Sequence, residues 1–212
     1  RRPPRSTLFP YTTLFRSRIS IPPRGAYTNP ASTFESFVGT PNMSLQDVQA
    51  VIESAKARGL THLEGYIRHR VPGMSDPKIQ EAAEVALEII ESVPVFLARA
   101  SQEARSRKMV KTVQPVLDHA ERYFLRPVDL IPEMTMGLAG LLDDTYLVLR
   151  ILQNLDRGPE PFLDWDLDFP IAFLRGLLGK EIGSQLDSLS VAAMEDMSQQ
   201  LALVWEQVSH EA

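Results

Sequence analysis

Residues 136–155, MGLAGLLDDTYLVLRILQNL, decide the fold class of this chain. At about 100° per residue, five leucines cluster on one helical face, and the apolar surface is wider than an ordinary amphipathic stripe. Three charged residues, Asp143, Asp144 and Arg150, make the stretch too polar for a conventional membrane span. We therefore predict one long helix here, which ends before Gly158 and Pro159. The five leucines are Leu138, Leu141, Leu142, Leu149 and Leu152.

The segments between Met43 and residue 75 also repeat apolar residues at helical spacing. We expect Ser44 to cap a first helix that Gly59 ends. Thr61 and Glu64 form a capping-box pattern, which predicts a second, short helix that Val71-Pro72-Gly73 terminates.

Prolines are expected to start, end or kink the next two predicted helices. Asp76 followed by Pro77 is typical of a helix start, because proline is favoured in the first turn. Pro94 is expected to end or kink that helix, since a proline lacks the backbone N–H and clashes with the preceding turn. For the same reason Pro115 is expected to kink or break the helical run of residues 95–125.

Between Pro161 and Pro170 the apolar residues no longer repeat at helical spacing. They alternate with polar residues, a period of two residues, which indicates an extended connector or a short edge strand. A short helix over residues 171–178, broken at Gly179, and a final helix capped by Ser184 are predicted to follow. These six to seven helices with short connections predict an all-α fold, a single irregular helical bundle with a flexible N-terminal leader. About 170 residues suffice for one hydrophobic core.

The N-terminal segment requires separate treatment. Residues 1–17, RRPPRSTLFPYTTLFRS, resemble the translation of a common sequencing adapter in one reading frame, so we exclude them from the fold prediction. Residues 18–42 are rich in Pro, Gly, Ser and Thr without helical or strand periodicity, which favours a disordered leader. Met43 is the first methionine, and we expect the native start there and the helical domain over residues 43–212.

Composition excludes several classes of site. The 212 residues include no Cys, which excludes disulfides, cysteine-ligated metals and a thiol nucleophile. The formal net charge is -5, and from Met43 onward 16 basic residues face 26 acidic ones. A domain this acidic is not expected to have nucleic acid as its main partner.

Tyr123 to Leu155 resembles the signature of the YkvA family, a bacterial domain of unknown function. That signature joins a P-x-D-L-I-P-D loop to a G-x-L-D-D helix start; here Glu133 replaces the final Asp of the loop, and residues 134–139 lack a second proline. The resemblance places the YkvA-like core at about residues 103–157. It implies a helical module without established activity, catalytic residues or cofactors, sometimes joined to membrane-associated proteins. The structural signature residues are Pro127, Asp129, Pro132, Gly140, Asp143 and Asp144.

Two interpretations of these acidic residues stay open. Helical geometry places Asp143 on a solvated face, near Arg150, and places Asp144 among apolar side chains, where a carboxylate requires hydrogen bonds or a cation. We expect Asp144 to brace the adjoining RPVDLIPE loop. The alternative is a metal-dependent hydrolase, because carboxylates suit magnesium, manganese or calcium. Its site would comprise Asp129, Glu133, Asp143 and Asp144, with Asp129, Glu133 and Asp144 the best candidates to share one ion.

A basic cluster stands out in this acidic chain. Polybasic helices contact anionic membrane surfaces or acidic partners, although such a run is more often a solvated face. We therefore predict a non-enzymatic binding or scaffold module in the cytoplasm. Its expected partner is an unknown protein or an anionic membrane, contacted peripherally at the inner membrane through the basic helix and the wide apolar surface of residues 134–155. The cluster comprises Arg99, Arg105, Arg107, Lys108 and Lys111.

Overall fold

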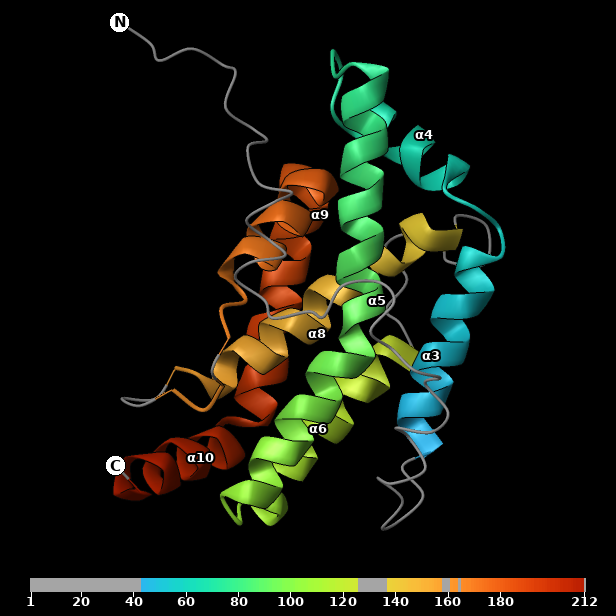
Figure 1. Ribbon diagram of the computed structural model, residues 1–212. Helices are drawn as coiled ribbons and strands as arrows, with labels where there is room; N and C mark the ends of the chain where they lie inside the picture. Colours follow the sequence, from blue (N-terminus) through green and yellow to red (C-terminus); the bar gives the residue numbers. More distant parts are fainter. Residues whose placement is uncertain (1–42, 126–136, 158–160, 164, 212) are drawn as a thin grey trace, which may run out of the picture. The chain divides into compact units, whose positions relative to one another are not determined.

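The computed structural model describes residues 43–125, 137–157, 161–163 and 165–211. Across these ranges the chain forms seven α-helices and one short 3₁₀-helix, with no β-strand (Figure 1). The prediction of an irregular all-helical bundle is therefore confirmed. The expected leader and the RPVDLIPE loop, residues 126–133, lie outside the described residues. Among the residues that are described, no helix combines the length and the apolar character needed to cross a membrane.

The first two helices are α3, Met43–Lys56, and α4, Thr61–Arg70. Gly59 follows α3 with a φ of 79°, a left-handed conformation that suits glycine, as the predicted stop requires. Both predicted caps are wrong. Ser44 lies within α3 instead of before it. The N-cap position of α4 is occupied by Leu60, not by Thr61, and no side chain forms a capping hydrogen bond there.

Helix α5, Asp76–Ser106, does not end at Pro94, which was the first of the two predicted alternatives. It begins at Asp76-Pro77 as expected but continues through Pro94, and the chain turns only at residues 107–109, where Lys108 has a φ of 57°. Helix α6, Val110–Leu125, likewise contains Pro115. Burial on both sides of Pro94 explains the continuity, because the apolar stripe of α5 stays packed and offsets the missing backbone hydrogen bond. The buried neighbours are Val93, Phe96 and Leu97.

The segment predicted as one helix over residues 136–155 has two parts. A 3₁₀-helix, η2, spans Gly137–Leu141, and α8 spans Leu142–Leu155. Helix α8 packs against α5, α6, α9 and α10 (Figure 1), and residues 142–149 are all buried. The wide apolar surface is therefore buried in the core, and the prediction that it contacts a membrane is wrong, because other helices cover it.

Helix α9, Asp168–Asp196, is interrupted at Gly179, where φ is 79° and ψ is 175°, so the predicted break is confirmed. The predicted cap at Ser184 is wrong, because the helix has already resumed and the Ser184 hydroxyl donates to the Lys180 carbonyl at 2.7 Å. A second interruption at Met197 separates α9 from α10, Ser198–Glu211.

The segment between α8 and α9 is a connector whose described residues include bends at Phe162, Leu163 and Trp165. Its described residues, 161–163 and 165–167, form no strand. Leu163 and Leu167 are buried, as the alternating pattern predicts, but Phe162 is buried as well.

Candidate functional site

The two signature carboxylates of α8 are buried. Asp143 and Asp144 are each 1% exposed. The prediction is confirmed for Asp144, which was expected on an apolar face, and it is wrong for Asp143, which was expected in solvent. Helix α8 has partners on several sides, so the face that carries Asp143 is covered as well. The periodicity of a single helix identifies its less apolar face but does not show whether another element covers that face.

Tyr66 of α4 lies close enough to Asp143 to be affected by its charge. Burial raises the pKa of the Tyr66 hydroxyl, and the negative charge of Asp143 raises this pKa further, while Arg70 acts in the opposite direction. The Arg70 guanidinium lies 5.4 Å from the centroid of the Tyr66 ring. The N-terminal end of α8 therefore lies in a closed region of the fold, where carboxylates are shielded from solvent.

The remaining signature residues are described only in part. Gly140 is buried within η2. Pro127, Asp129, Pro132 and Glu133 lie outside the described residues. Within the described ranges, no group of three or more acidic or histidine side chains is arranged to hold a metal ion. The predicted brace and the alternative metal site both involve the loop and stay predictions.

The predicted basic cluster lies where α5 turns into α6. Arg107 is engaged within the fold: its Nε donates to Glu103 Oε1 at 2.6 Å, and its guanidinium lies 5.5 Å from the centroid of the Phe162 ring. Arg99 is half-buried. The other three cations are exposed, and no ion pair involves them among the described residues. They are Arg105, Lys108 and Lys111, and we call them the basic corner.

Sequence reasoning missed a polar network that joins α8 to α9. The Tyr146 hydroxyl donates to Asp187 Oδ1 at 2.5 Å, and Arg175 Nη2 lies 2.8 Å from Asp187 Oδ2. Burial raises the pKa of Tyr146 to about 12, with the hydrogen bond to Asp187 as the next cause. One signal was present in the sequence, since a tyrosine on the apolar face of a helix usually requires a partner for its hydroxyl.

Gly183 makes room for this network. A Cβ atom on Gly183 would lie 1.7 Å from Arg175 Nη1, so the guanidinium passes directly over the glycine. The network is a structural clamp between two helices, because Tyr146 is only 1% exposed and closed to a substrate.

One comparison with known proteins agrees with the position of the signature. Residues 122–149 match the family model described as a protein of unknown function (DUF1232). The described part of this match is the end of α6, the helix η2 and the first half of α8, which includes both buried carboxylates. The match supports a domain of unknown function, and the more specific resemblance to the YkvA family stays a prediction. Searches of curated proteins and of solved structures give no match.

Proposed function

We propose that this chain is a helical binding module that contacts an anionic membrane surface through the basic corner. The observation that carries the proposal is the exposure of Arg105, Lys108 and Lys111 at a single turn of the chain, without an ion pair among the described residues. An exposed cation that has no internal partner is available to an external anion.

The local charge around the basic corner supports a contact with an anionic surface through this part of the chain. Residues 99–114 carry five basic side chains and one acidic side chain, Glu103, which pairs with Arg107. From Met43 onward the chain is acidic, so this turn is a local exception to its net repulsion from an anionic surface. Each Lys or Arg near such a surface contributes about 1 kcal/mol, so three cations give weak and salt-sensitive attachment.

The buried carboxylates support a binding role over a catalytic one. Asp143 and Asp144 are each 1% exposed, so neither side chain is presented to an external substrate. In this proposal Asp144 braces the loop of residues 126–133 against α8.

Vesicle sedimentation tests the proposal. The full chain is mixed at low salt with phosphatidylcholine vesicles that contain about one-third phosphatidylserine, and again with pure phosphatidylcholine vesicles. We expect retention only on the anionic vesicles, and loss of retention at about 0.5 M salt. The triple variant Arg105→Glu, Lys108→Glu, Lys111→Glu is expected to stay in the supernatant.

A matched control distinguishes the effect of the basic corner on binding from the effect of the net charge of the chain. Lys78→Glu, Arg122→Glu and Lys180→Glu change the charge by the same amount at three exposed positions elsewhere. This control is expected to retain more binding than the corner variant. Equal loss in both variants, or no retention of the original chain at low salt, contradicts the proposal and favours a simple solvated face.

A further inference from the structure

A second region of the molecule forms a pocket that the proposed membrane contact does not use. The pocket has a volume of about 370 Å³ and lies between the end of α8, the connector and the start of α9. This volume falls within the range of small-ligand sites, about 300–1,000 Å³. Five charged side chains line it, two arginines and three aspartates. They are Arg150, Asp156, Arg157, Asp166 and Asp168.

The three carboxylates of the pocket already accept hydrogen bonds from the fold. Asp156 Oδ1 accepts hydrogen bonds from the backbone N–H groups of residues 162 and 163, at 2.9 and 2.7 Å. Asp166 Oδ1 accepts a hydrogen bond from the backbone N–H of Asp168 at 2.7 Å. Asp168 Oδ1 accepts one from Gln153 Nε2 at 2.6 Å. These contacts assign the carboxylates a structural task, the shaping of the connector and its attachment to α8.

Among the described residues, neither arginine forms an ion pair with a carboxylate. Arg150 Nη1 donates to the neutral Gln153 Oε1 at 2.5 Å. Its Nε is buried and has no hydrogen-bond partner in the described part of the chain. Arg157 is exposed and forms no ion pair with any described residue. A buried donor without an acceptor is costly, and two guanidinium groups beside one pocket suit an oxyanion that accepts from both.

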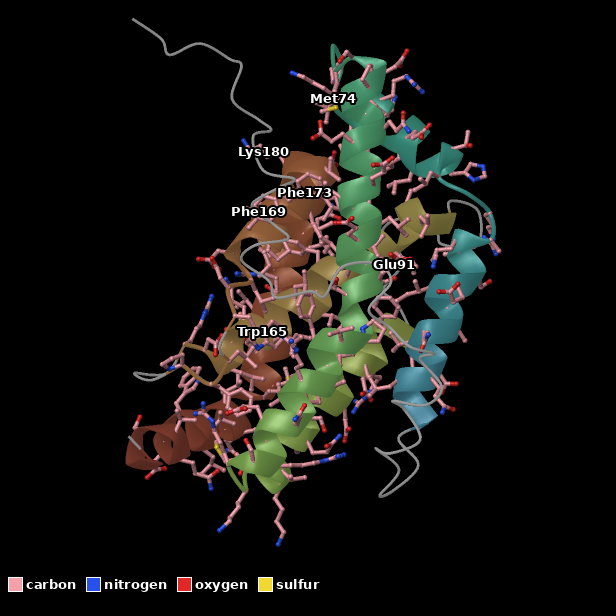
Figure 2. All side chains as sticks on the ribbon, viewed as in Figure 1. Met74, Glu91, Trp165, Phe169, Phe173 and Lys180 are labelled. Carbon is pink, nitrogen blue, oxygen red and sulfur yellow. The ribbon has the colours of Figure 1, made fainter. Side chains whose placement is uncertain are left out.

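Trp165 supplies an aromatic surface beside these cations. One face of its ring system stacks on Phe96, with a centroid distance of 4.7 Å and an interplanar angle of 11°. This stacking fixes the orientation of the ring, and Trp165, labelled in Figure 2, also lines the pocket. A rigid indole is a suitable platform for a planar ligand ring.

We propose that this pocket binds a small planar organic acid, whose oxyanion meets Arg150 and Arg157 while its ring packs against Trp165. The nearby carboxylates oppose an anion, so the oxyanion alone binds poorly and the ring contact is needed as well. The ligand chemistry is a carboxylate or a phosphate that is attached to a planar ring system directly or through a sugar. The site is separate from the basic corner, so either proposal can fail without the other.

Calorimetric titration of the full chain tests the inference with two acids, adenosine 5′-monophosphate for phosphate and indole-3-carboxylate for carboxylate. Adenosine and inorganic phosphate are the two halves of the first acid, and indole and acetate are the two halves of the second. We expect at least one acid to bind about tenfold more tightly than either of its halves. We expect Arg157→Gln to weaken that binding about tenfold or more, and Arg122→Gln, at an exposed position outside the pocket, to leave it unchanged.

A second variant addresses the ring contact. Trp165→Leu is expected to weaken the bound acid and to leave the affinity for inorganic phosphate unchanged, and Trp165→Phe is expected to retain part of the binding while preserving the stacking on Phe96. Far-UV circular dichroism verifies that each variant is folded. The inference is overturned if neither acid binds at about 5 mM, if the Arg157→Gln and Arg150→Gln variants bind as well as the original chain, or if inorganic phosphate alone binds as tightly as the acid.

Discussion

The Tyr146 hydroxyl of α8 donates a hydrogen bond of 2.5 Å to Asp187 Oδ1 of α9, and Asp187 Oδ2 lies 2.8 Å from Arg175 of the same helix. Gly179 interrupts α9 between Arg175 and Asp187. The clamp therefore ties both segments of the interrupted helix to the central helix α8. Because a break without tertiary contacts leaves two helical segments free to move, the clamp has a clear stabilising role.

This clamp predicts a loss of stability at alkaline pH. The pKa of Tyr146 is raised to about 12 in the folded chain, above its ordinary value of 10.0. The stabilisation is fully present below pH 10 and is lost as the pH rises through about 12, because the unfolded chain loses this proton first. The free energy of unfolding, measured by urea denaturation between pH 9 and 12, is expected to fall by about 2–3 kcal/mol more in the original chain than in Tyr146→Phe.

The space over Gly183 predicts a coupling between two residues. Gly183→Ala stabilises the helix by about 1 kcal/mol, because alanine has the higher helix propensity. Its new Cβ, however, displaces the Arg175 guanidinium from Asp187. The ion pair is half-exposed and worth at most about 1 kcal/mol, so the two effects nearly cancel in the original chain. In an Arg175→Ala background the substitution is expected to stabilise by about 1 kcal/mol. A double-mutant cycle measured by urea unfolding that gives no coupling contradicts this prediction.

The proposed brace at Asp144 predicts that both a polar and an apolar replacement are destabilising. Asp144→Asn and Asp144→Leu are each expected to lower the free energy of unfolding by about 1–3 kcal/mol, because each removes a carboxylate oxygen that would accept a hydrogen bond in the proposed brace. Asp118→Asn, at an exposed position of α6, is the control and is expected to change little. Melting temperatures unchanged in both Asp144 variants disprove the brace.

Pro94 predicts a stabilising substitution. Helix α5 runs uninterrupted from Asp76 to Ser106, so Pro94→Ala restores a backbone N–H within a continuous helix and removes a clash with the preceding turn. Proline also restricts the unfolded chain, which offsets part of the gain. A net increase of about 1–2 kcal/mol in the free energy of unfolding is expected from denaturant titration. A decrease would show that a proline-induced bend is required for packing.

Divalent cations distinguish the binding module from the metal-dependent hydrolase. Since any ion bound only by the folded state raises the melting temperature, calorimetry with magnesium, manganese and calcium is decisive. No increase is expected under the proposed function. An increase that Asp129→Asn and Glu133→Gln abolish, together with hydrolytic activity, would support the hydrolase instead.

Backbone chemistry visible in the sequence was sufficient for the fold class and for several boundaries. The helical period, the Asp76-Pro77 start and the interruptions at Gly59 and Gly179 depend on local properties, which are the missing N–H of proline and the freedom of glycine at positive φ. Such properties act within about one helical turn and need no knowledge of distant residues.

Tertiary structure decided the burial of Asp143, the passage of α5 through Pro94 and the meeting of Tyr146 with Asp187. Each depends on which element packs against a helix face, and residues 41 positions apart carry no local signal of their contact. The pocket at Arg150 and Trp165 arises in the same way, from the path of the connector between α8 and α9. Propensity and periodicity describe one helix at a time, whereas burial and hydrogen bonding across helices depend on their packing in three dimensions.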